Sequence, residues 1–395
     1  MDLQEIRKQL DGIDAQIVKL TEERMQLSAE VAAFKIETGK PVYDREREKQ
    51  KLQAVGELAH GAFNRQAMQE LFTQIMTISR RYQYQILAEH NQEVDMGFQE
   101  VAKLAKTNVR VVYQGVEGAY SQAAAIQCFG EDTPMYHVKT WEDAMREVEE
   151  ERADYAVLPI ENSSAGAVTD NYDLLVKYHN YIVAEICIPI RHALLGTMQA
   201  ELADVRTVFS HPQALMQSSV FLNAHRDWKQ ISVENTAVAA KKVLEDGDVT
   251  QAAVASEIAG KLYGLKVLES AIQYNKSNTT RFIVVAKSPI YEREANKVSV
   301  CFELPHVSGS LYNMLGNFIF NRVNMMKIES RPIAGKNWEY RFFVDIEGNL
   351  GQAGVRNALK GIFSEAANVK ILGCYKSENR AETEEKEMQE RKNKG

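Results

Sequence analysis

Apolar residues recur every three or four positions along the first part of the chain, which is the spacing of one face of an α-helix. The pattern runs over residues 3–38 without a proline, and its members are Leu3, Ile6, Leu10, Ile13, Ile17, Leu20, Leu27, Val31 and Phe34. A helix of that length extends about 55 Å at about 1.5 Å per residue. Because a small domain cannot cover so long a stripe, we expect a second copy of the chain to bury it, in a homodimer or a higher homo-oligomer.

One position in this stripe is charged. Arg24 falls between Leu20 and Leu27, where the spacing predicts an apolar residue, so its guanidinium points into the apolar seam. A buried charge is costly unless it is paired, which predicts an anion at this level. Lys35 lies about 20° from Arg24 around the helix, whereas Arg7 lies about 80 to 100° from both and is placed to reach a partner's site. For Arg7 and Lys35, an ordinary solvated cation remains an alternative.

Gly39-Lys40-Pro41 interrupts the helical pattern, and a charged run from Asp44 to Glu48 and a further helix follow. The chain then shows a pattern that resembles the all-helical chorismate mutase family, whose members are intertwined dimers: Arg7, Arg24, Lys35, Asp44, Arg47, Glu48, Ser79 and Gln83. The resemblance covers residues 3–90.

The resemblance also implies a role for each of these side chains. Arg24, Arg47 and the partner chain's Arg7 would hold the substrate carboxylates. Lys35 and Gln83 would donate hydrogen bonds to the ether oxygen. Glu48 and Asp44 would contact the ring hydroxyl, and Ser79 would line the pocket. Such a set suits a sigmatropic rearrangement, which needs no nucleophile, metal or cofactor, only a folded substrate and stabilisation of charge on the breaking C–O bond.

Residues 91–107 are polar with a weak helical pattern, and we interpret them as a semi-ordered linker. In residues 108–288, short apolar runs each lead into a polar turn and a helical pattern, and the runs are Val109–Tyr113, Tyr155–Pro159, Val205–Phe209, Ala252–Ala255 and Phe282–Ala286. Strands that alternate with helices predict parallel sheets covered on both faces. In such sheets, ligands bind beyond the carboxyl ends of the strands, where these polar segments fall.

The polar segments resemble those of prephenate dehydratase: Gly115…Gly118-Ala119-Tyr120-Ser121, Pro159 to Ser164, Ser210-His211-Pro212-Gln213…Gln217 and Thr280-Arg281-Phe282. Individually they have simpler explanations, because Ser163 and Ser164 can cap a helix and His211 can cap or pack. The resemblance implies a site in a cleft between two lobes with Thr280 as the principal catalytic residue. The further site residues that we predict are Glu161, Asn162 and Arg281 for catalysis, and Ser121, Ser163, Ser164, Ser210, His211, Gln213, Gln217 and Phe282 for substrate binding.

That reaction expels hydroxide and carbon dioxide from a cyclohexadiene, and aromatisation drives it. The protein must donate to the leaving hydroxyl and anchor two carboxylates. We expect Arg281 and helix N-termini to anchor the carboxylates and Thr280 to act as a positioned donor, because a threonine hydroxyl is a poor acid near neutral pH. Glu161 is the alternative proton source if burial raises its pKa.

Residues 296–376 show a strand, a helix, two strands, a helix and a last strand, which is the ferredoxin-like order. Gly309-Ser310-Leu311 and Glu329-Ser330-Arg331-Pro332 resemble the two signature stretches of the ACT domain found in prephenate dehydratases. The resemblance implies that phenylalanine binds between paired domains as a feedback effector. The alternative is a dimerisation module without a ligand. Residues 377–395 form a charged tail, which we expect to be disordered or a frayed helix.

Composition narrows the classes of function. The chain has 395 residues and a net charge of −7, which argues against a nucleic acid partner. Its four cysteines, Cys128, Cys187, Cys301 and Cys374, are far apart, so they suggest neither a zinc site nor a disulfide framework. The N-terminus carries charged residues from Asp2 onward and shows no apolar signal core. No apolar run is long enough to span a membrane. We expect a cytoplasmic soluble protein without a membrane partner.

Together these patterns predict a multidomain chain with an all-α module, a two-lobed α/β domain and an α+β ferredoxin-like ACT domain. It resembles the family of bifunctional enzymes that join a chorismate mutase to a prephenate dehydratase. The resemblance implies conversion of chorismate through prephenate to phenylpyruvate, with no metal or other cofactor. Two alternatives stay open: a dehydratase with a purely structural helical module, and a non-catalytic small-molecule sensor.

Overall fold

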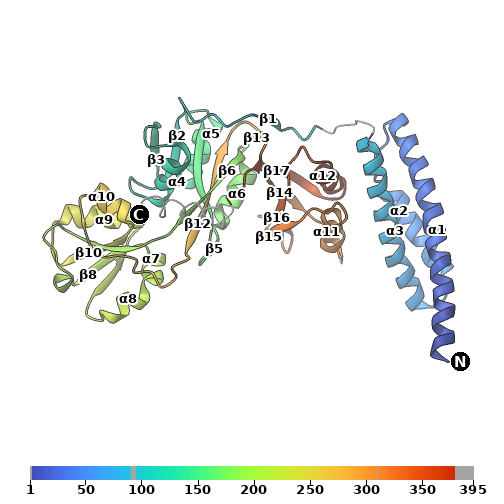
Figure 1. Cartoon of the computed structure of the whole chain (residues 1–395), viewed down its shortest axis with the longest axis horizontal. Helices are drawn as coiled ribbons and strands as arrows, with labels where there is room; N and C mark the ends of the chain where they lie inside the picture. Colours follow the sequence, from blue (N-terminus) through green and yellow to red (C-terminus); the bar gives the residue numbers. More distant parts are fainter. Residues whose placement is uncertain (1, 90–94, 308, 379–395) are drawn as a thin grey trace, which may run out of the picture. The chain divides into compact units, whose positions relative to one another are not determined.

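The computed structural model describes residues 2–89, 95–307 and 309–378, which divide into two compact units. One unit consists of the chain up to Met96 together with Val300–Lys370, and the other consists of Gly97–Ser299 together with the chain from Ile371. Figure 1 labels the helices and strands of both units. Among the residues described, no helix combines the length with the hydropathy that a bilayer-spanning segment needs.

The first unit opens with the helices α1 (Leu3–Thr38), α2 (Arg45–Leu58) and α3 (Ala62–Glu89). The predicted long helix is therefore confirmed. It ends where Gly39 adopts a left-handed conformation with φ 66°, which a residue without a Cβ adopts at little cost. Asp44 caps α2 by accepting a hydrogen bond from the backbone N–H of Arg47 at 3.0 Å.

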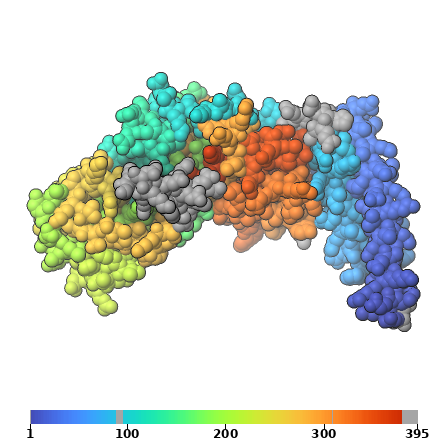
Figure 2. Space-filling model, in the orientation of Figure 1, coloured from blue at the N-terminus to red at the C-terminus, as the bar shows by residue number. Residues whose placement is uncertain are grey.

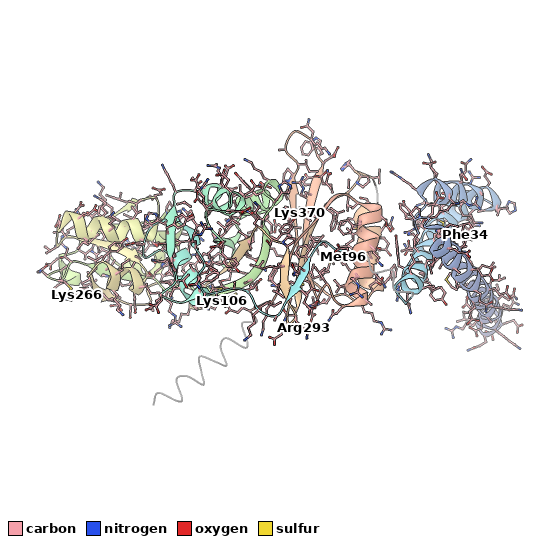
Figure 3. All side chains as sticks on the ribbon, turned by 90° about the horizontal axis from the view of Figure 1, so that it is seen from above. Phe34, Met96, Lys106, Lys266, Arg293 and Lys370 are labelled. Carbon is pink, nitrogen blue, oxygen red and sulfur yellow. The ribbon has the colours of Figure 1, made fainter. Side chains whose placement is uncertain are left out.

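The apolar stripe of α1 is uncovered within the single chain. Its members, from Leu3 to Phe34, are between 40% and 63% exposed, and Figure 3 labels Phe34 among the side chains of this helix. The helix buries Ser28 and Ala32, which lie on a different side from most of the stripe. The N-terminal end of α1 extends past α3 in Figures 1 and 2. An exposed apolar surface of this kind is typical of a site where a partner protein binds and removes it from water.

The later part of the chain continues with β14 (Lys297–Glu303), α11 (Ser310–Phe320), β15 (Met325–Pro332), β16 (Tyr340–Glu347), α12 (Ala353–Glu365) and β17 (Ala367–Tyr375). The strands lie in the order β15-β16-β14-β17, and β15 and β16 are antiparallel. The elements match those predicted for residues 296–376 in type and order.

The second unit contains two lobes. In the first lobe the sheet order is β6-β12-β4-β2-β3, and the strands are β2 (Val111–Gln114), β3 (Met135–Val138), β4 (Tyr155–Asn162), β6 (Tyr181–Pro189) and β12 (Thr279–Ala286). The short strand β5 (Gly166–Ala167) pairs with β4. Its helices are α4 (Tyr120–Phe129), α5 (Trp141–Glu149) and α6 (Thr169–Lys177). A buried cluster that includes Val111, Tyr113, Val157 and Val284 forms its core.

In the second lobe the sheet order is β11-β7-β10-β8-β9, and the strands are β7 (Ala193–Gly196), β8 (Thr207–Ser210), β9 (Lys229–Ser232), β10 (Gln251–Ala255) and β11 (Lys266–Glu269). Its helices are α7 (Pro212–Gln217), α8 (Ser219–Ala224), α9 (Thr236–Asp246) and α10 (Glu257–Leu262), with a 3-10 turn η1 at Leu202–Asp204. The chain crosses from the first lobe to the second after β6 and returns through β12.

The prediction of parallel sheets was only partly right. The pairs β2/β3, β2/β4, β8/β9 and β8/β10 are parallel, whereas β12 runs antiparallel to both β4 and β6. The reason is the crossing between lobes, because a strand that returns from the second lobe enters the first sheet from the opposite end. The strand also begins earlier than predicted: β12 starts at Thr279, so Thr280 and Arg281 lie inside it.

The predicted linker contains a strand that its weak helical pattern did not indicate. β1 (Gln99–Val101) pairs in parallel with β13 (Ile290–Glu292). Backbone pairing with a distant segment fixes this conformation, and no local pattern carries that information. The predicted charged tail lies outside the described residues from residue 379 onward.

Candidate active sites

The helical module brings two of its predicted cations against polar side chains of α3. The guanidinium of Arg24 donates to the hydroxyl of Ser79. One turn further along α3, the Lys35 ammonium donates to Oε1 of Gln83 at 3.1 Å and to the carbonyl of Val42 at 2.6 Å. Ser79 and Gln83 are buried, so α1 and α3 enclose a polar patch between them.

This patch carries positive charge that the protein does not fully neutralise. Burial lowers the pKa of Arg24, and the nearby Glu48 carboxylate opposes that shift. Burial also lowers the pKa of Lys35, with Asp44 and Glu48 opposing the shift and Arg80 adding to it. Two cations whose charged forms are penalised by burial are stabilised by an anionic ligand. The arrangement therefore suits a substrate that carries carboxylates.

The other residues predicted for this site lie at its edge or away from it. Glu48 is half-buried, and Asp44 and Arg47 are exposed at the start of α2. Arg7 is exposed near the N-terminal end of α1, more than four turns along the helix from Arg24 at about 3.6 residues per turn. A single chain consequently does not bring Arg7 to this patch.

Arg80 is a member of this charge network that the sequence analysis missed. Its guanidinium is buried and binds Glu48, donates to Thr77 Oγ1 at 3.1 Å, and pairs with Glu365 of α12 at 3.1 Å. The guanidinium also lies over the ring of Tyr43, 5.0 Å from the centroid. An arginine in the middle of a helix is common on solvated faces, so the sequence does not indicate that Arg80 is buried. Arg80 holds the Glu48 carboxylate in place and joins two carboxylates that would otherwise repel.

Replacement of Arg80 is expected to destabilise this unit. Arg80→Met leaves the partly buried carboxylates of Glu48 and Glu365 close together without a counter-charge, and removal of one partner of a buried ion pair costs about 3 kcal/mol. Thermal unfolding measured by circular dichroism should show the loss. Because the second change removes the repulsion, the double variant Arg80→Met/Glu365→Gln should recover part of it. Equal melting temperatures for wild type and Arg80→Met would contradict the assignment.

The second unit contains a cavity of about 180 Å³ where its two lobes meet. The walls come from the end of β2, from the first turns of α4, α7 and α9, from Asn162 at the end of β4 and from Thr280 of β12. The predicted residues that line it are Ser121, Asn162, His211, Gln213, Gln217 and Thr280. The structure therefore brings a subset of the predicted residues together around one cavity between the lobes.

Thr280 is fixed by Asn162 on the neighbouring strand. The two residues are register partners in the β12/β4 pair, and the Asn162 amide donates to Thr280 Oγ1 at 2.9 Å and to Asn278 Oδ1 at 2.9 Å. The Asn162 carbonyl oxygen in turn accepts from the backbone N–H groups of Ser164 and Ala165, each at 3.0 Å. Since the Thr280 oxygen accepts here, its own O–H is available to donate to a group in the cavity.

A buried amide in the same cavity lacks a partner. Gln217 Oε1 is 3.0 Å from Nε2 of His192, but Gln217 Nε2 has no hydrogen-bond partner among the described residues. An unpaired buried amide is costly, so its donors mark a position where a ligand oxygen would fit. Burial lowers the pKa of His192, against the opposing hydrogen bond to Gln217, which favours the neutral imidazole.

Helix N-termini are the groups at this cavity that attract anions. None of the described residues that line it is Lys or Arg. The first residues of α4 and of α9 line it instead, and free N–H groups at helix N-termini attract anions. His211 lines the cavity as well, as predicted for a binding residue. It also caps α7, because its side chain accepts a hydrogen bond from the backbone N–H of Gln213 at 3.2 Å.

The structure does not place Arg281, which was predicted to anchor a carboxylate, in the lining of the Thr280 cavity. Neighbouring residues of a strand point to opposite faces, so Arg281 points away from the cavity that Thr280 lines. Its guanidinium binds Glu161 at 2.7 Å and Glu185 at 3.1 Å. Glu161 is likewise outside the cavity lining, next to Asn162 but on the other face, so it is not placed to protonate a group beside Thr280.

The remaining predicted binding residues support the cavity and do not line it. Ser163 Oγ accepts from the backbone N–H of Thr279 at 3.0 Å, and Ser164 Oγ lies 3.3 Å from Asn278 Oδ1. Ser210 is buried and donates to the carbonyl of Val254 at 2.5 Å. Phe282 belongs to the hydrophobic core of the first lobe.

Several cavity residues escaped the sequence analysis. Gln114, His192, Asn235 and Thr236 all line it, as does Tyr120, which belongs to a quoted motif but was not predicted as a site residue. Asn235 caps α9 by accepting from Val238 N at 2.8 Å, and an Asn ahead of a helical pattern is a signal that could have been used. His192 follows a strand without such a signal. The described residues contain no group of three or more His, Cys, Asp or Glu placed to share a metal ion.

The residues predicted to bind an effector fall into two groups. Gly309 is the N-cap of α11 with φ 82°, and Ser310 lines a cavity of about 320 Å³ beside Pro305 and Tyr340. Leu311 is half-buried in the first turn of α11, outside that lining. Glu329, Ser330 and Arg331 lie on β15, the outermost strand in its sheet order, and do not line this cavity.

Comparison with known proteins matches both candidate sites to families. Residues 6–84 match the family model of chorismate mutase type II, and residues 111–290 match that of prephenate dehydratase. The bifunctional chorismate mutase/prephenate dehydratase of Escherichia coli (strain K12) is 34% identical over 382 residues, which cover 95% of this chain and 96% of that protein.

Two solved structures are similar over the later part of the chain. The prephenate dehydratase of Arthrobacter aurescens, determined in complex with L-Phe, has a TM-score of 0.64 at 29% identity and covers 68% of this chain and 90% of its own. GqqA, described as a quorum quenching acylase, has a TM-score of 0.63 at 30% identity and covers 68% of this chain and 98% of its own. By the extent and identity of these matches, the chain belongs to the bifunctional chorismate mutase/prephenate dehydratase family.

Proposed function

We propose that this chain rearranges chorismate to prephenate and then converts prephenate to phenylpyruvate, with feedback inhibition by phenylalanine. The observation that carries the proposal is that one chain holds two distinct polar sites. One contains half-buried cations, Arg24 and Lys35, and the other contains the fixed Thr280 hydroxyl in a cavity lined by helix N-termini.

In the first reaction the helical module folds a dianionic substrate into its reactive conformer. Arg24, Arg47 and the partner chain's Arg7 hold the carboxylates. Lys35 and Gln83 donate to the ether oxygen, where negative charge develops as the C–O bond breaks. Electrostatic stabilisation of this kind needs no covalent intermediate. Asp44 and Glu48 contact the ring hydroxyl, and Ser79 lines the pocket and positions Arg24.

In the second reaction the cavity holds prephenate with its leaving hydroxyl beside Thr280. The Thr280 O–H donates to that hydroxyl while Asn162 fixes the Thr280 oxygen. The C–O bond breaks, the carboxylate on the same ring leaves as carbon dioxide, and its electron pair completes the aromatic ring. Water is released once the departing hydroxide takes up a proton. Gln217 and the N-termini of α4 and α9 bind the substrate oxygens.

The helical module is proposed to dimerise through α1. The exposed apolar stripe and the remote Arg7 both support this, because a second copy would cover the stripe and would bring its own Arg7 to the site. The dimer, or a higher homo-oligomer built from it, is therefore required for a complete set of mutase residues.

The β14–β17 segment is proposed to be a ferredoxin-like ACT domain that binds phenylalanine. The order β14-α11-β15-β16-α12-β17 supports the fold, and exposed Met326 and Ile328 on β15 support pairing of two copies. Gly309, Ser310 and Leu311 would meet Glu329, Ser330 and Arg331 of a paired domain around the effector. The prephenate dehydratase of Arthrobacter aurescens was determined with L-Phe.

Domain boundaries follow the same scheme. We place the mutase module at residues 1–90, a linker at 91–107, the dehydratase domain at 108–288, the ACT domain at 296–376 and the charged tail at 377–395. The two family matches, 6–84 and 111–290, support the positions of the first and the third of these.

A time course with purified protein tests the whole proposal. Chorismate loss and phenylpyruvate formation are followed separately, then prephenate is used as substrate, and each run is repeated with phenylalanine. Phenylpyruvate from both substrates, suppressed by phenylalanine, is the expected result. Product from prephenate without loss of chorismate would make the helical module structural, and no turnover of either would favour a sensor.

The mutase activity is expected to decline at a pH below 10.5, the ordinary pKa of a lysine side chain. Burial lowers the pKa of Lys35 below its ordinary value of 10.5, so the ammonium is lost as pH rises through this lowered pKa. Measured kcat/KM for chorismate should therefore fall before about pH 10.5, because kcat/KM reports the free enzyme. In Lys35→Arg any remaining activity should keep its alkaline limb to higher pH, since a guanidinium stays charged. An identical limb in both proteins would remove Lys35 as its source.

A further inference from the structure

A buried carboxylate on β6 joins the strand that carries Thr280 to the first residue of β14 and to the chain just beyond β17, all within the second unit. The side chain of Glu185 is 2% exposed, and its Oε2 accepts from Arg281 at 3.1 Å and from Lys297 at 2.7 Å. Its Oε1 accepts from the hydroxyl of Ser377 at 3.3 Å. Lys297 is itself only 5% exposed at its side chain. A buried carboxylate with several charge-assisted bonds is held in one place.

The two residues that bind Glu185 from the β14–β17 segment come from its opposite ends. Lys297 is the first residue of β14, and Ser377 lies just beyond the end of β17. The ends are also bonded to each other, since Asn296 N donates to Tyr375 O at 3.1 Å and Ser377 N donates to Asn296 Oδ1 at 2.7 Å. A displacement of either end of the segment therefore acts on the same carboxylate.

The last part of β17 and the chain beyond it also contact the backbone of β6 directly. Gly373 pairs with Ile182, and a Cβ at Gly373 would lie 2.2 Å from the Ile182 carbonyl oxygen. Further on, Glu378 accepts from Cys187 N at 2.6 Å, and Cys187 is the register partner of Arg281. The contact is thus close and lies at the level of Arg281.

Arg281 transmits the position of Glu185 to the dehydratase cavity. It directly follows Thr280 along β12, and its second carboxylate partner, Glu161, is the neighbour of Asn162 on β4. The Glu185–Arg281–Glu161 row lies on one face of the sheet, and the Thr280–Asn162 pair lies on the other. The row and the pair share the backbones of β12 and β4, where Arg281 is next to Thr280 and Glu161 is next to Asn162, so these two strands are the route by which a shift of the row would reach the pair.

We propose that Glu185 is a positioning residue that couples the β14–β17 segment to the dehydratase reaction. Lys297 and Ser377 fix Glu185, which fixes Arg281 and so sets the separation of Thr280 and Asn162 from the substrate. Binding of phenylalanine to the segment changes turnover of prephenate through this carboxylate. The inference rests on the proposed phenylalanine response and names the residues that carry it.

Full-length variants test this coupling at increasing strength. Ser377→Ala removes one hydroxyl contact without a change in charge, Lys297→Met removes one cation, and Glu185→Gln removes the shared carboxylate. The matched control is Lys266→Met, which breaks the exposed ion pair with Glu201 in the other lobe, away from Arg293 (Figure 3). Each protein is assayed with prephenate, with and without phenylalanine, and with chorismate. Phenylalanine binding is measured by calorimetry.

Ser377→Ala is expected to keep kcat for prephenate within about twofold and to raise the half-inhibitory phenylalanine concentration about fivefold, the effect of one lost hydrogen bond. Lys297→Met and Glu185→Gln are expected to lower kcat about tenfold with little change in KM and to abolish inhibition, while phenylalanine still binds. Chorismate turnover should stay at the wild-type level in all variants. Lys266→Met should behave as wild type throughout.

Inhibition curves in Ser377→Ala and Lys297→Met that match wild type would overturn the inference. A parallel fall of prephenate and chorismate turnover would also overturn it, because that result indicates loss of folded protein. If wild type neither binds phenylalanine nor is inhibited by it, the effector proposal fails separately. In that case an unchanged kcat in Lys297→Met and Glu185→Gln would reject Glu185 as a positioning residue, and a selective fall in kcat would retain it.

Discussion

Thr280→Val is expected to lower kcat for prephenate by about 10²- to 10⁴-fold, the range of a lost catalytic proton donor. Valine keeps the shape of threonine on β12 and removes the hydroxyl that Asn162 fixes at 2.9 Å. The leaving hydroxide then departs without a hydrogen-bond donor. Initial rates of phenylpyruvate formation at saturating prephenate measure the effect, and chorismate loss in the same protein should be unchanged.

Thr279→Val is the matched control for this prediction. It makes the same replacement one residue earlier on β12, where the side chain points to the other face of the strand and does not line the cavity. Turnover within a fewfold of wild type is expected there. Near-normal kcat in Thr280→Val, together with loss of activity in Glu161→Gln, would assign proton delivery to Glu161 and leave Thr280 with a binding role.

Arg24→Met should lower kcat/KM for chorismate by about 10³-fold, as removal of one preorganised donor at a developing charge costs about 10²- to 10³-fold and a lost carboxylate contact adds to it. Folding should not suffer. Burial lowers the pKa of Arg24, which means that its charged form is held at a cost, with Glu48 offsetting only part of it. Methionine removes that cost, so the melting temperature should be equal or higher.

Lys19→Met provides the comparison on the same helix. Lys19 is exposed, so its loss should leave both activities and the melting temperature near wild type. An Arg24→Met protein with a lowered melting temperature and equal losses of both activities would indicate a structural arginine and contradict the assignment. Normal phenylpyruvate formation from prephenate in this variant would locate the defect in the helical module.

Patterns with a local cause could be predicted from the sequence. The spacing of Leu3 to Phe34 predicts α1, and Gly39 predicts its end, because both depend on residues within one or two turns. The charge of Arg24 within that pattern also indicated a functional position, and the structure pairs it with Ser79 of α3. Local signals likewise predicted the element order of residues 296–376.

Predictions failed where the outcome depended on strand alternation. Thr280 and Arg281 are adjacent in sequence and looked like one recognition element. Their inclusion in β12 separates them to opposite faces, so only Thr280 reaches the cavity. The start of a strand cannot be read from its apolar run when the first residues are polar and are held by pairing with β4 and β6.

Long-range charge pairing was beyond the sequence altogether. A whole lobe separates Glu185 from Lys297 along the chain, and the β14–β17 segment separates Lys297 from Ser377. No local sequence pattern indicates that the three side chains are in contact. Arg80 and Glu365 are a second case. Buried polar clusters of this kind become visible only once the fold brings their members together.

Residues of a single chain suffice to line the Thr280 cavity, whereas the mutase site as proposed takes Arg7 from another copy. Dilution should therefore separate the two reactions. Below the dissociation constant of the α1 dimer, chorismate turnover would fall with the square of protein concentration while prephenate turnover would remain linear. A cell that contains little of this enzyme would then still convert prephenate made by other enzymes but would no longer convert chorismate. The concentration of the enzyme would therefore determine whether chorismate is used for phenylpyruvate synthesis.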